Sequence, residues 1–208
     1  MKKLTKIFFE TSTAAAAKQL LGKYIVRRYK GEVITAKIVE TEAYTGTDDP
    51  GSHACRKITP RNKIMFGPPG AAYVYFCYGS HYLFNIVTEK KGRPGAVLIR
   101  ACEPVAGIGL MQRFRDQPLK NLTNGPGKLT QAIGIGRIHN GIDLLGNELY
   151  IAEGKKEEFA IKSGPRIGIK KGLEKNWRFW IKNSAYVSVM EKRGKNRINT
   201  GKKAKESA

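Results

Sequence analysis

A run of aromatic residues around one Gly-Ser pair, "YVYFCYGSHYLFN" at residues 73–85, stands out because it holds four tyrosines and two phenylalanines. In an extended strand, the period of two places Tyr73, Tyr75 and Cys77 on one face, with Tyr78 close to the turn. Aromatic residues on strands ordinarily form core or cross-strand pairs. On a basic surface, however, an aromatic side chain near a turn can enter a duplex and fill the gap left by a rotated base. Both interpretations stay open on this run alone.

A second candidate is the acidic end of "VITAKIVETEAY", residues 33–44. The period of two predicts one strand face that changes from apolar to acidic and is formed by Ile34, Ala36, Ile38, Glu40, Glu42 and Tyr44. Carboxylates placed in this way can accept protons or stabilise positive charge. Taken alone, a glutamate at a strand end is more often a solvated surface residue.

The charge of the chain favours a polyanionic partner. Lys and Arg number 38 against 17 Asp and Glu, which gives a formal net charge of +21. A field of this strength concentrates nucleic acid near the protein surface. An anionic membrane surface is the weaker alternative, because the sequence has no long apolar span and no strongly amphipathic basic helix. We therefore expect double-stranded DNA or another nucleic acid as partner and no membrane.

The elements that must position these residues are a mixture of short helices and β-hairpins. One hairpin is expected around Lys30-Gly31 and another around Gly79-Ser80, a dipeptide suited to a two-residue turn. Residues 45–72, with four prolines, form a predicted loop of a length that is usually functional or disordered. Short helices are predicted at "TSTAAAAKQLLG", near residues 107–115 and at the start of "NGPGKLTQAIGI". "GAVLIRACEP" and most of residues 141–190 indicate strands and turns.

Composition limits the class of protein. A chain of 208 residues is enough for one domain with a substantial core. The three cysteines form no CxxC pair and have no histidine cluster beside them, so we expect no metal, no cofactor and no disulfide framework, only buried thiols in a reducing compartment. The start "MKKLTKIFFE" has too short an apolar run for a signal peptide. We expect a cytoplasmic monomer, associated with the nucleoid if the host is bacterial. Its domain is expected to span residues 1–190, with a basic, disordered tail at 191–208.

Several segments, in order and with spacing kept, resemble the alkyladenine (3-methyladenine) DNA glycosylase family, the methylpurine glycosylases built without a helix-hairpin-helix motif. They are "VETEAYTGTDDPGSHACRKITPRNKIMFGPPGAAYVYFCYGSHYLFNIV", "GAVLIRACEP" and "NGPGKL". The match runs from about residue 38 to residue 135 and resumes more weakly in "GPRIGI" and "WRFWIKNSAYVSV". The fold implied is α+β, a single domain around a curved, largely antiparallel β-sheet with a protruding β-hairpin.

The resemblance also implies catalytic residues. Glu42, in the "ETEAY" motif, would be the general base that deprotonates water for attack on C1′ of the deoxyribose of a damaged nucleotide. Arg100, in "VLIRACEP", matches the arginine that helps to hold this water. The alternative for Arg100 is a salt bridge, also with Glu42, and the two roles are compatible.

A base pocket follows from the same resemblance. Tyr44, His53 and Tyr75 would stack around a flipped purine, whose alkylation at N3 or N7 makes it cationic and attractive to aromatic faces by roughly 0.5–2 kcal/mol. Asn85 falls where the family has an asparagine that crowds the exocyclic amino group of guanine. Without the family match, His53 would more often be a loop histidine, and Asn85 would satisfy backbone groups.

Contacts with the rest of the duplex are also implied. Tyr78 corresponds to the side chain that intercalates in the minor groove. Residues suited to the DNA backbone, because cations and exposed N–H groups bind phosphate, are Arg61, Lys63, Gly125, Gly127 and Lys128. The sequence departs from the family at "KKGLEKNW" after "RIGI", so we expect no backbone role for residues 167–169.

The resulting hypothesis is a monofunctional DNA repair glycosylase that hydrolyses the N-glycosidic bond of alkylated purines and leaves an abasic site. No lysine falls in the matched pocket, so strand cleavage through a Schiff base is not expected. Substrates could include 3-methyladenine, 7-methylguanine, hypoxanthine and ethenoadenine. Two alternatives remain: a non-catalytic basic nucleic-acid-binding protein, for which charge and aromatics suffice, and a lesion sensor that binds without excision.

Overall fold

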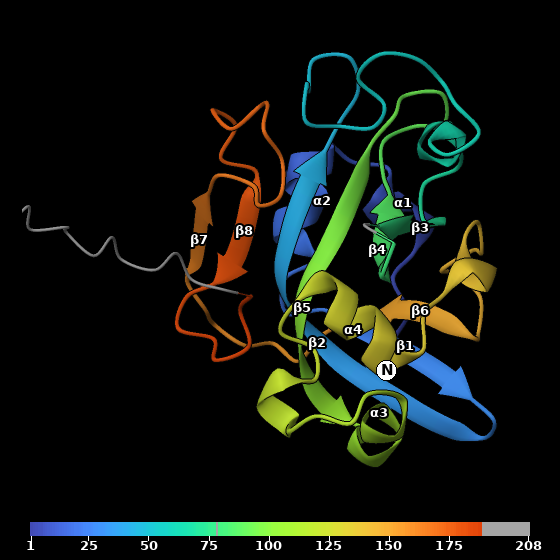
Figure 1. Ribbon diagram of the computed structural model, residues 1–208, viewed down its shortest axis with the longest axis vertical. Coiled ribbons are helices and arrows are strands. Elements are labelled where there is room, and N and C mark those ends of the chain that lie inside the picture. The colour runs from blue at the N-terminus through green and yellow to red at the C-terminus, as the bar shows by residue number, and fades with distance from the viewer. Residues whose placement is uncertain (78, 189–208) are drawn as a thin grey trace, which may run out of the picture.

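The computed structural model describes residues 1–77 and 79–188, and one antiparallel sheet of eight strands organises them (Figure 1). The strand order is β3-β4-β5-β2-β1-β6, and β8 joins a second edge of β2 and carries β7. The strands are β1 (Tyr24–Tyr29), β2 (Glu32–Tyr44), β3 (Ala72–Cys77), β4 (His81–Val87), β5 (Ala96–Ala106), β6 (Leu149–Ala152), β7 (Ile161–Gly164) and β8 (Arg178–Ile181). The sheet curls into a half-barrel, so the predicted α+β fold with a single domain and a curved antiparallel sheet is confirmed.

Helices cover both faces of this sheet. They are α1 (Lys6–Phe9), α2 (Thr13–Gln19), α3 (Ile108–Phe114) and α4 (Pro126–Ile133), with short 3-10 turns η1 (Lys63–Phe66), η2 (Leu119–Asn121) and η3 (Arg137–His139). Helix α2 lies behind β2 in Figure 1, where the hydroxyl of Thr41 donates to the carbonyl of Ala17 at 2.8 Å. Helix α4 lies in front, and its Gly127 packs against the side chain of His81 on β4. The helices in the described part of the chain are all too short or too polar to cross a membrane.

Strand β2 is the element that places the acidic residues. Residues 35–44 of β2 pair with β5 along one edge, while the other edge pairs first with β1, at residues 32–37, and then with β8, at residues 40–42. The register is irregular between Ile38 and Thr41 but returns, because Ile38 pairs with Cys102 and Glu42 with Leu98. Both steps are four residues long, so the predicted alternation is kept and Glu42 stays on the same face as Ile38. The acidic end of β2 is therefore enclosed between two strands.

The aromatic run forms the predicted hairpin, but its turn differs from the prediction. Cys77 pairs with His81, so residues 78–80 separate the strands, where a two-residue Gly79-Ser80 turn would require residue 78 to pair with His81. The prediction of a two-residue turn is therefore wrong. The sequence signal came from glycine, and Gly79 does take a left-handed φ of 65°, which three-residue loops also require. The cross-strand pairs Tyr73–Asn85 and Tyr75–Leu83 follow from this register and set the face that each side chain occupies.

Other sequence predictions can be compared with the described residues. The Lys30-Gly31 hairpin is confirmed, with both residues at positive φ (46° and 82°) as a tight turn between twisted strands requires. Residues 45–70 contain no helix or strand other than η1, as predicted from their prolines and glycines. Cys102 lies in the core, whereas Cys55 and Cys77 are only half-buried, so the prediction of fully buried thiols is right for one of the three. Tyr78 and the tail at 191–208 lie outside the described residues.

Candidate active site

A cavity of about 310 Å³ opens on the face of the sheet that carries α4. Strands β3, β4 and β5 form its floor, and the loops at Gly51–His53 and Ile167–Ile169 form its walls together with Pro126. Five of the predicted site residues line it: Tyr44, His53, Tyr75, Asn85 and Arg100. Positions up to 56 residues apart in the sequence, from Tyr44 to Arg100, therefore meet at one cavity of the size that small-molecule sites usually have.

Three rings form the aromatic wall of the cavity. The ring centroids of His53 and Tyr75 are 4.8 Å apart with planes at 68°, and those of Tyr73 and Tyr75 are 5.0 Å apart. The His53 Nδ1 atom lies 2.9 Å from the hydroxyl of Tyr73 and forms a hydrogen bond with it. Burial raises the pKa of Tyr73 to about 12 and also raises the pKa of Tyr75, so both phenols stay neutral. Burial and the nearby Arg61 lower the pKa of His53, which keeps the imidazole uncharged at neutral pH.

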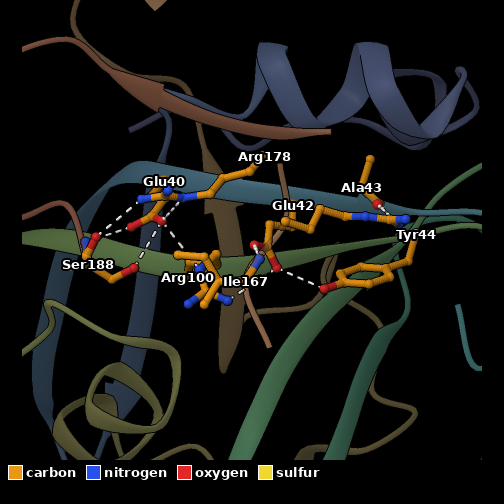
Figure 2. Close-up of polar contacts among 9 residues, drawn as sticks. Glu40, Glu42, Ala43, Tyr44, Arg100, Ile167, Arg178 and Ser188 are labelled. Carbon is orange, nitrogen blue, oxygen red and sulfur yellow. Dashed lines mark hydrogen bonds and ion pairs between the residues drawn. The ribbon is translucent and has the colours of Figure 1, made fainter. Parts of the chain in front are cut away.

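Glu42 does not line the cavity itself but lies directly behind its wall. The side chain is completely buried, and three groups donate hydrogen bonds to its carboxylate (Figure 2). The Tyr44 hydroxyl (2.8 Å) and Arg100 Nη1 (3.1 Å) donate to Oε2, and the backbone N–H of Ile167 donates to Oε1 at 2.7 Å. All three donors belong to residues that line the cavity. A single layer of side chains and backbone therefore separates the carboxylate from the cavity.

The pKa of Glu42 lies above its usual value because burial disfavours the charged form. Arg100, the Ile167 N–H and the Tyr44 hydroxyl act in the opposite direction, and the neighbouring Glu40 adds to the rise. The pKa of Tyr44 is raised as well, by burial and by the adjacent Glu42 carboxylate, so Tyr44 remains a hydrogen-bond donor. The site therefore holds a buried carboxylate with a raised proton affinity.

Arg100 bridges two carboxylates of β2. Its Nη1 contacts Glu42, and its Nε lies 3.3 Å from Oε1 of Glu40. Burial alone would lower the pKa of Arg100, but the two carboxylates outweigh that effect and raise it. The salt bridge that the sequence left open as an alternative therefore exists.

The carboxylate of Glu40 accepts further hydrogen bonds from β8 and from the segment at residue 188. Arg178 Nε donates to Glu40 at 2.6 Å, and both the N–H and the hydroxyl of Ser188 donate to the same carboxylate, at 2.6 and 2.9 Å (Figure 2). Glu40 is completely buried, which explains why it needs this number of donors. The β8 edge of β2 and the segment at residue 188 thereby fix the strand that carries Glu42.

Three predicted residues, Asn85, Arg61 and Lys63, differ in burial and in contacts. Asn85 is buried on β4, and its Nδ2 donates to the carbonyl of Tyr73 at 3.0 Å. The Arg61 guanidinium lies over the ring of Tyr75, 4.7 Å from its centroid, so Arg61 reaches the aromatic wall and is not simply a surface cation. Lys63 is exposed at the start of η1.

The predicted glycine turn does begin a helix. Gly125 is the residue before α4, and a side chain at Gly127 would come within 2.4 Å of His81, which explains the need for glycine there. Lys128 is exposed, with its Nζ 2.9 Å from Oδ1 of Asn124. DNA contact by these residues stays a prediction.

Three contributors to the site were missed from the sequence. The sequence predicts no backbone role for Ile167, yet its N–H makes the shortest of the three hydrogen bonds to Glu42. Asp49 and Arg166 form a buried ion pair next to it, with oxygen–nitrogen distances of 2.6 Å. The signal that could have found Ile167 is the "GPRIGI" segment itself, which matches the family although the residues after it do not. No local signal links Asp49 to Arg166, because 117 residues separate them.

Comparisons with known proteins agree with this arrangement. Residues 7–185 match the family model of methylpurine-DNA glycosylase. A protein of Prosthecochloris aestuarii (strain DSM 271 / SK 413) is 49% identical over 191 residues, covering 90% of this chain and 92% of the relative. Proteins of Clostridium acetobutylicum and Desulfitobacterium hafniense (strain Y51) are 46% and 44% identical, covering 91% of this chain and 99% and 100% of their own. All three relatives carry the provisional name 3-methyladenine DNA glycosylase.

The chain therefore belongs to the methylpurine-DNA glycosylase family. The resemblance seen in the sequence is confirmed, and so is the class of enzyme, a DNA glycosylase that acts in DNA repair.

Proposed function

We propose that this enzyme excises alkylated purines, 3-methyladenine among them, from duplex DNA by flipping the damaged nucleotide into the 310 Å³ cavity. The observation that carries the proposal is the position of Glu42. A fully buried carboxylate, held by three donors, lies directly behind an aromatic cavity that can accept a base. The provisional names of the relatives support 3-methyladenine as a substrate.

Binding of the flipped base is assigned to Tyr44, His53 and Tyr75. Purines alkylated at N3 or N7 carry positive charge, and aromatic faces attract cations by roughly 0.5–2 kcal/mol. One face of the Tyr75 ring is covered by Arg61 and one face of the Tyr44 ring by Arg166, each with the guanidinium 4.7 Å from the ring centroid. The flipped base is proposed to stack on the other face of these rings. A neutral His53 adds no repulsion toward a cationic purine.

Hydrolysis is assigned to water activated by Glu42. A carboxylate has roughly four acceptor positions, and three are taken by Tyr44, Arg100 and Ile167. The remaining position suits one water molecule, which gives its proton to Glu42 as it attacks C1′. The negative charge also stabilises the oxocarbenium-like sugar that forms as the base departs. General-base assistance contributes typically about 10²- to 10⁴-fold.

The departing base needs little help when it is cationic, because its ring charge already weakens the glycosidic bond. Neutral lesions such as hypoxanthine or ethenoadenine would need protonation or a hydrogen bond as they leave, and 7-methylguanine falls with the cationic group. Asn85, fixed by its hydrogen bond to Tyr73, crowds the exocyclic amino group of guanine and discriminates against the normal base. Water attack without an amine nucleophile leaves an abasic site and an intact strand.

Contact with the rest of the duplex is assigned to a further set of residues. Tyr78, outside the described residues, is proposed as the intercalating wedge on the strength of the family resemblance. Arg61, Lys63 and Lys128, together with the N–H groups near Gly125 and Gly127, are proposed to bind phosphate. The domain is proposed to span residues 1–190, with the basic segment 191–208 aiding the search for damage.

The experiment that tests this function uses the purified full-length chain and duplex DNA methylated with a simple alkylating agent. Chromatography of the released bases is expected to show free 3-methyladenine, with DNA strands cut only after alkaline treatment. Binding to methylated duplex without base release would instead identify a lesion sensor. Equal binding to methylated and unmethylated DNA, again without release, would identify a non-catalytic nucleic-acid-binding protein.

A further inference from the structure

Asp49 and Arg166 form an ion pair that lies entirely inside the protein, beside the site but outside the roles assigned above. Arg166 Nη1 and Nη2 donate to Oδ2 and Oδ1 of Asp49, both at 2.6 Å, in a bidentate fork. Both side chains are completely buried. Bidentate pairs of this kind fix both partners in position as well as in distance, because a planar guanidinium matches a planar carboxylate.

The pair is enclosed by backbone from the end of β2 and from two loops. Arg166 Nη1 also donates to the carbonyl of Ala43 at 2.8 Å, and Nη2 to that of Gly172 at 3.1 Å. The backbone N–H of Gly51 donates to Asp49 at 3.1 Å. A β-carbon at Gly51 or Gly172 would lie 2.9 or 2.8 Å from Arg166 Nη2, so the backbone packs directly on the guanidinium. The Asp49–Arg166 pair thereby connects the end of β2 with the loops at residues 45–51 and 165–172.

Two of the three groups that donate to Glu42 belong to residues that adjoin Arg166. Ile167, whose N–H lies 2.7 Å from Oε1 of Glu42, is the next residue after Arg166 in the chain. Tyr44, whose hydroxyl lies 2.8 Å from Oε2, has the Arg166 guanidinium 4.7 Å from its ring centroid. Arg166 itself makes no hydrogen bond to Glu42, so its influence on the carboxylate passes through these two neighbours.

We infer that Arg166, locked by Asp49, is a positioning residue that holds the Ile167 N–H and the Tyr44 hydroxyl on the carboxylate of Glu42. The catalytic importance of this arrangement rests on the proposed function. The positions of the hydrogen-bond donors around Glu42 can be tested without measuring catalysis. Loss of the Asp49–Arg166 ion pair is expected to leave Glu42 with fewer hydrogen-bond donors and a less defined position. A carboxylate that loses hydrogen bonds to its charged form is protonated more readily.

The charged and titratable groups around Glu42 come from several elements. Glu40 and Tyr44 share its strand, Arg100 lies on β5, Tyr75 on β3, and Arg166 in the loop before β8. Arg178 on β8 pairs with Glu42 through the backbone while its side chain binds Glu40. Substitution of Asp49 alters none of these groups chemically, so a change in the Glu42 titration reports on how they are positioned.

The test compares Asp49→Asn and Arg166→Lys with Asp48→Asn, a matched control that removes an exposed carboxylate from the adjacent position. NMR of the full-length protein follows the backbone amide of Ile167 and titrates the side-chain carboxyl of Glu42. In Asp49→Asn and Arg166→Lys, the Ile167 amide signal is expected to shift upfield and the Glu42 midpoint to rise by roughly one pH unit, since a hydrogen bond to a charged group is lost. Asp48→Asn is expected to change neither signal.

A merely structural role for the pair would lower the melting temperature and leave both NMR readings of the folded fraction unchanged, and that result would overturn the inference. Should Arg166→Lys fail to fold, Asp49→Asn carries the test, because its amide keeps the size of the carboxyl. Single-turnover excision then distinguishes a failure of the proposed function from a failure of the positioning role. An inactive wild type with the expected NMR changes would refute the proposed function and keep the positioning role. An active wild type without those changes would do the reverse.

Discussion

Arg100 Nη1 lies 3.1 Å from Oε2 of Glu42, and both side chains are buried on neighbouring antiparallel strands. The distance means that the proposed base and the arginine at the cavity wall form one unit, in which a change to either alters the other. The same guanidinium reaches Glu40, so the pair is anchored to the interior of the sheet as well as to the cavity. Positions of charge in such a unit are fixed before any ligand arrives, which is the condition for electrostatic stabilisation of a transition state.

The raised pKa of Glu42 makes a prediction about the pH dependence of excision. The general base must be ionised, so the rate is expected to fall as the pH falls through the Glu42 pKa, which lies above the ordinary 4.5. Single-turnover rates on duplex containing 7-methylguanine, whose charge is fixed, give the acid limb directly. A limb at or below pH 4.5 would show that Glu42 is not the titrating group.

The raised pKa of Glu42 also affects the stability of the fold, and its contribution decreases with rising pH, whereas the rate of excision increases. A carboxyl that is protonated more readily in the folded state contributes stability below the unfolded value of 4.5, and that contribution is lost as the pH rises through the folded pKa. Circular dichroism at each pH therefore has to accompany the rate measurements. The acid limb is attributed to catalysis only where the protein remains folded.

Asn85→Ala is expected to relax the discrimination against guanine. Truncation opens the cavity where Asn85 is held by the Tyr73 carbonyl, and release of 7-methylguanine should rise about tenfold relative to 3-methyladenine, the scale of selectivity that pocket shape usually provides. A competition assay with both lesions measures the ratio.

The matched control is Asn140→Ala. Asn140 also bonds the backbone of β3, through its Oδ1 and the N–H of Val74 at 2.9 Å, but it does not line the cavity. An equal change in the ratio for both variants would mean that strand β3 had shifted and that Asn85 does not select the base.

The same chemical change at two glycines is expected to have opposite effects on stability. A β-carbon at Gly154 would lie 1.9 Å from the carbonyl oxygen of Gly22, and backbone cannot yield easily, so Gly154→Ala should destabilise the fold by about 1–3 kcal/mol. At Gly109, in α3, the added carbon would meet no atom within 4 Å apart from its chain neighbours and the nearby backbone of its own helix, and Gly109→Ala should stabilise the fold by about 0.4–1 kcal/mol. Urea unfolding midpoints decide both signs.

The family resemblance implied the fold class and the residues of the cavity, while local patterns predicted the separate strands and the hairpin. Period two alone orders Tyr73, Tyr75 and Cys77 on one face, and the register of the hairpin then brings Asn85 beside them. The turn at residues 78–80 was misjudged, since a glycine at positive φ is compatible with loops of two or three residues. Asp49 and Arg166 could not be predicted to meet, because their ion pair depends on how two distant loops pack against the end of β2.

Lys128→Ala is expected to weaken DNA binding in a salt-dependent manner. Each phosphate contact that is lost lowers the slope of log K against log salt by about one. Lys30→Asn, at the far β1–β2 turn, removes a charge at a left-handed position that asparagine tolerates, and serves as the control. Equal slopes for Lys128→Ala and the wild type would remove Lys128 from the interface.

Glu42→Gln, studied in single-turnover excision together with lesion binding, tests the central proposal most directly. The variant is expected to bind methylated duplex with an affinity close to that of the wild type, while base release falls by at least about 10²-fold, the low end of general-base assistance. Wild-type and variant protein that release the same amount of 3-methyladenine at the same rate would contradict the assignment of Glu42 as the base.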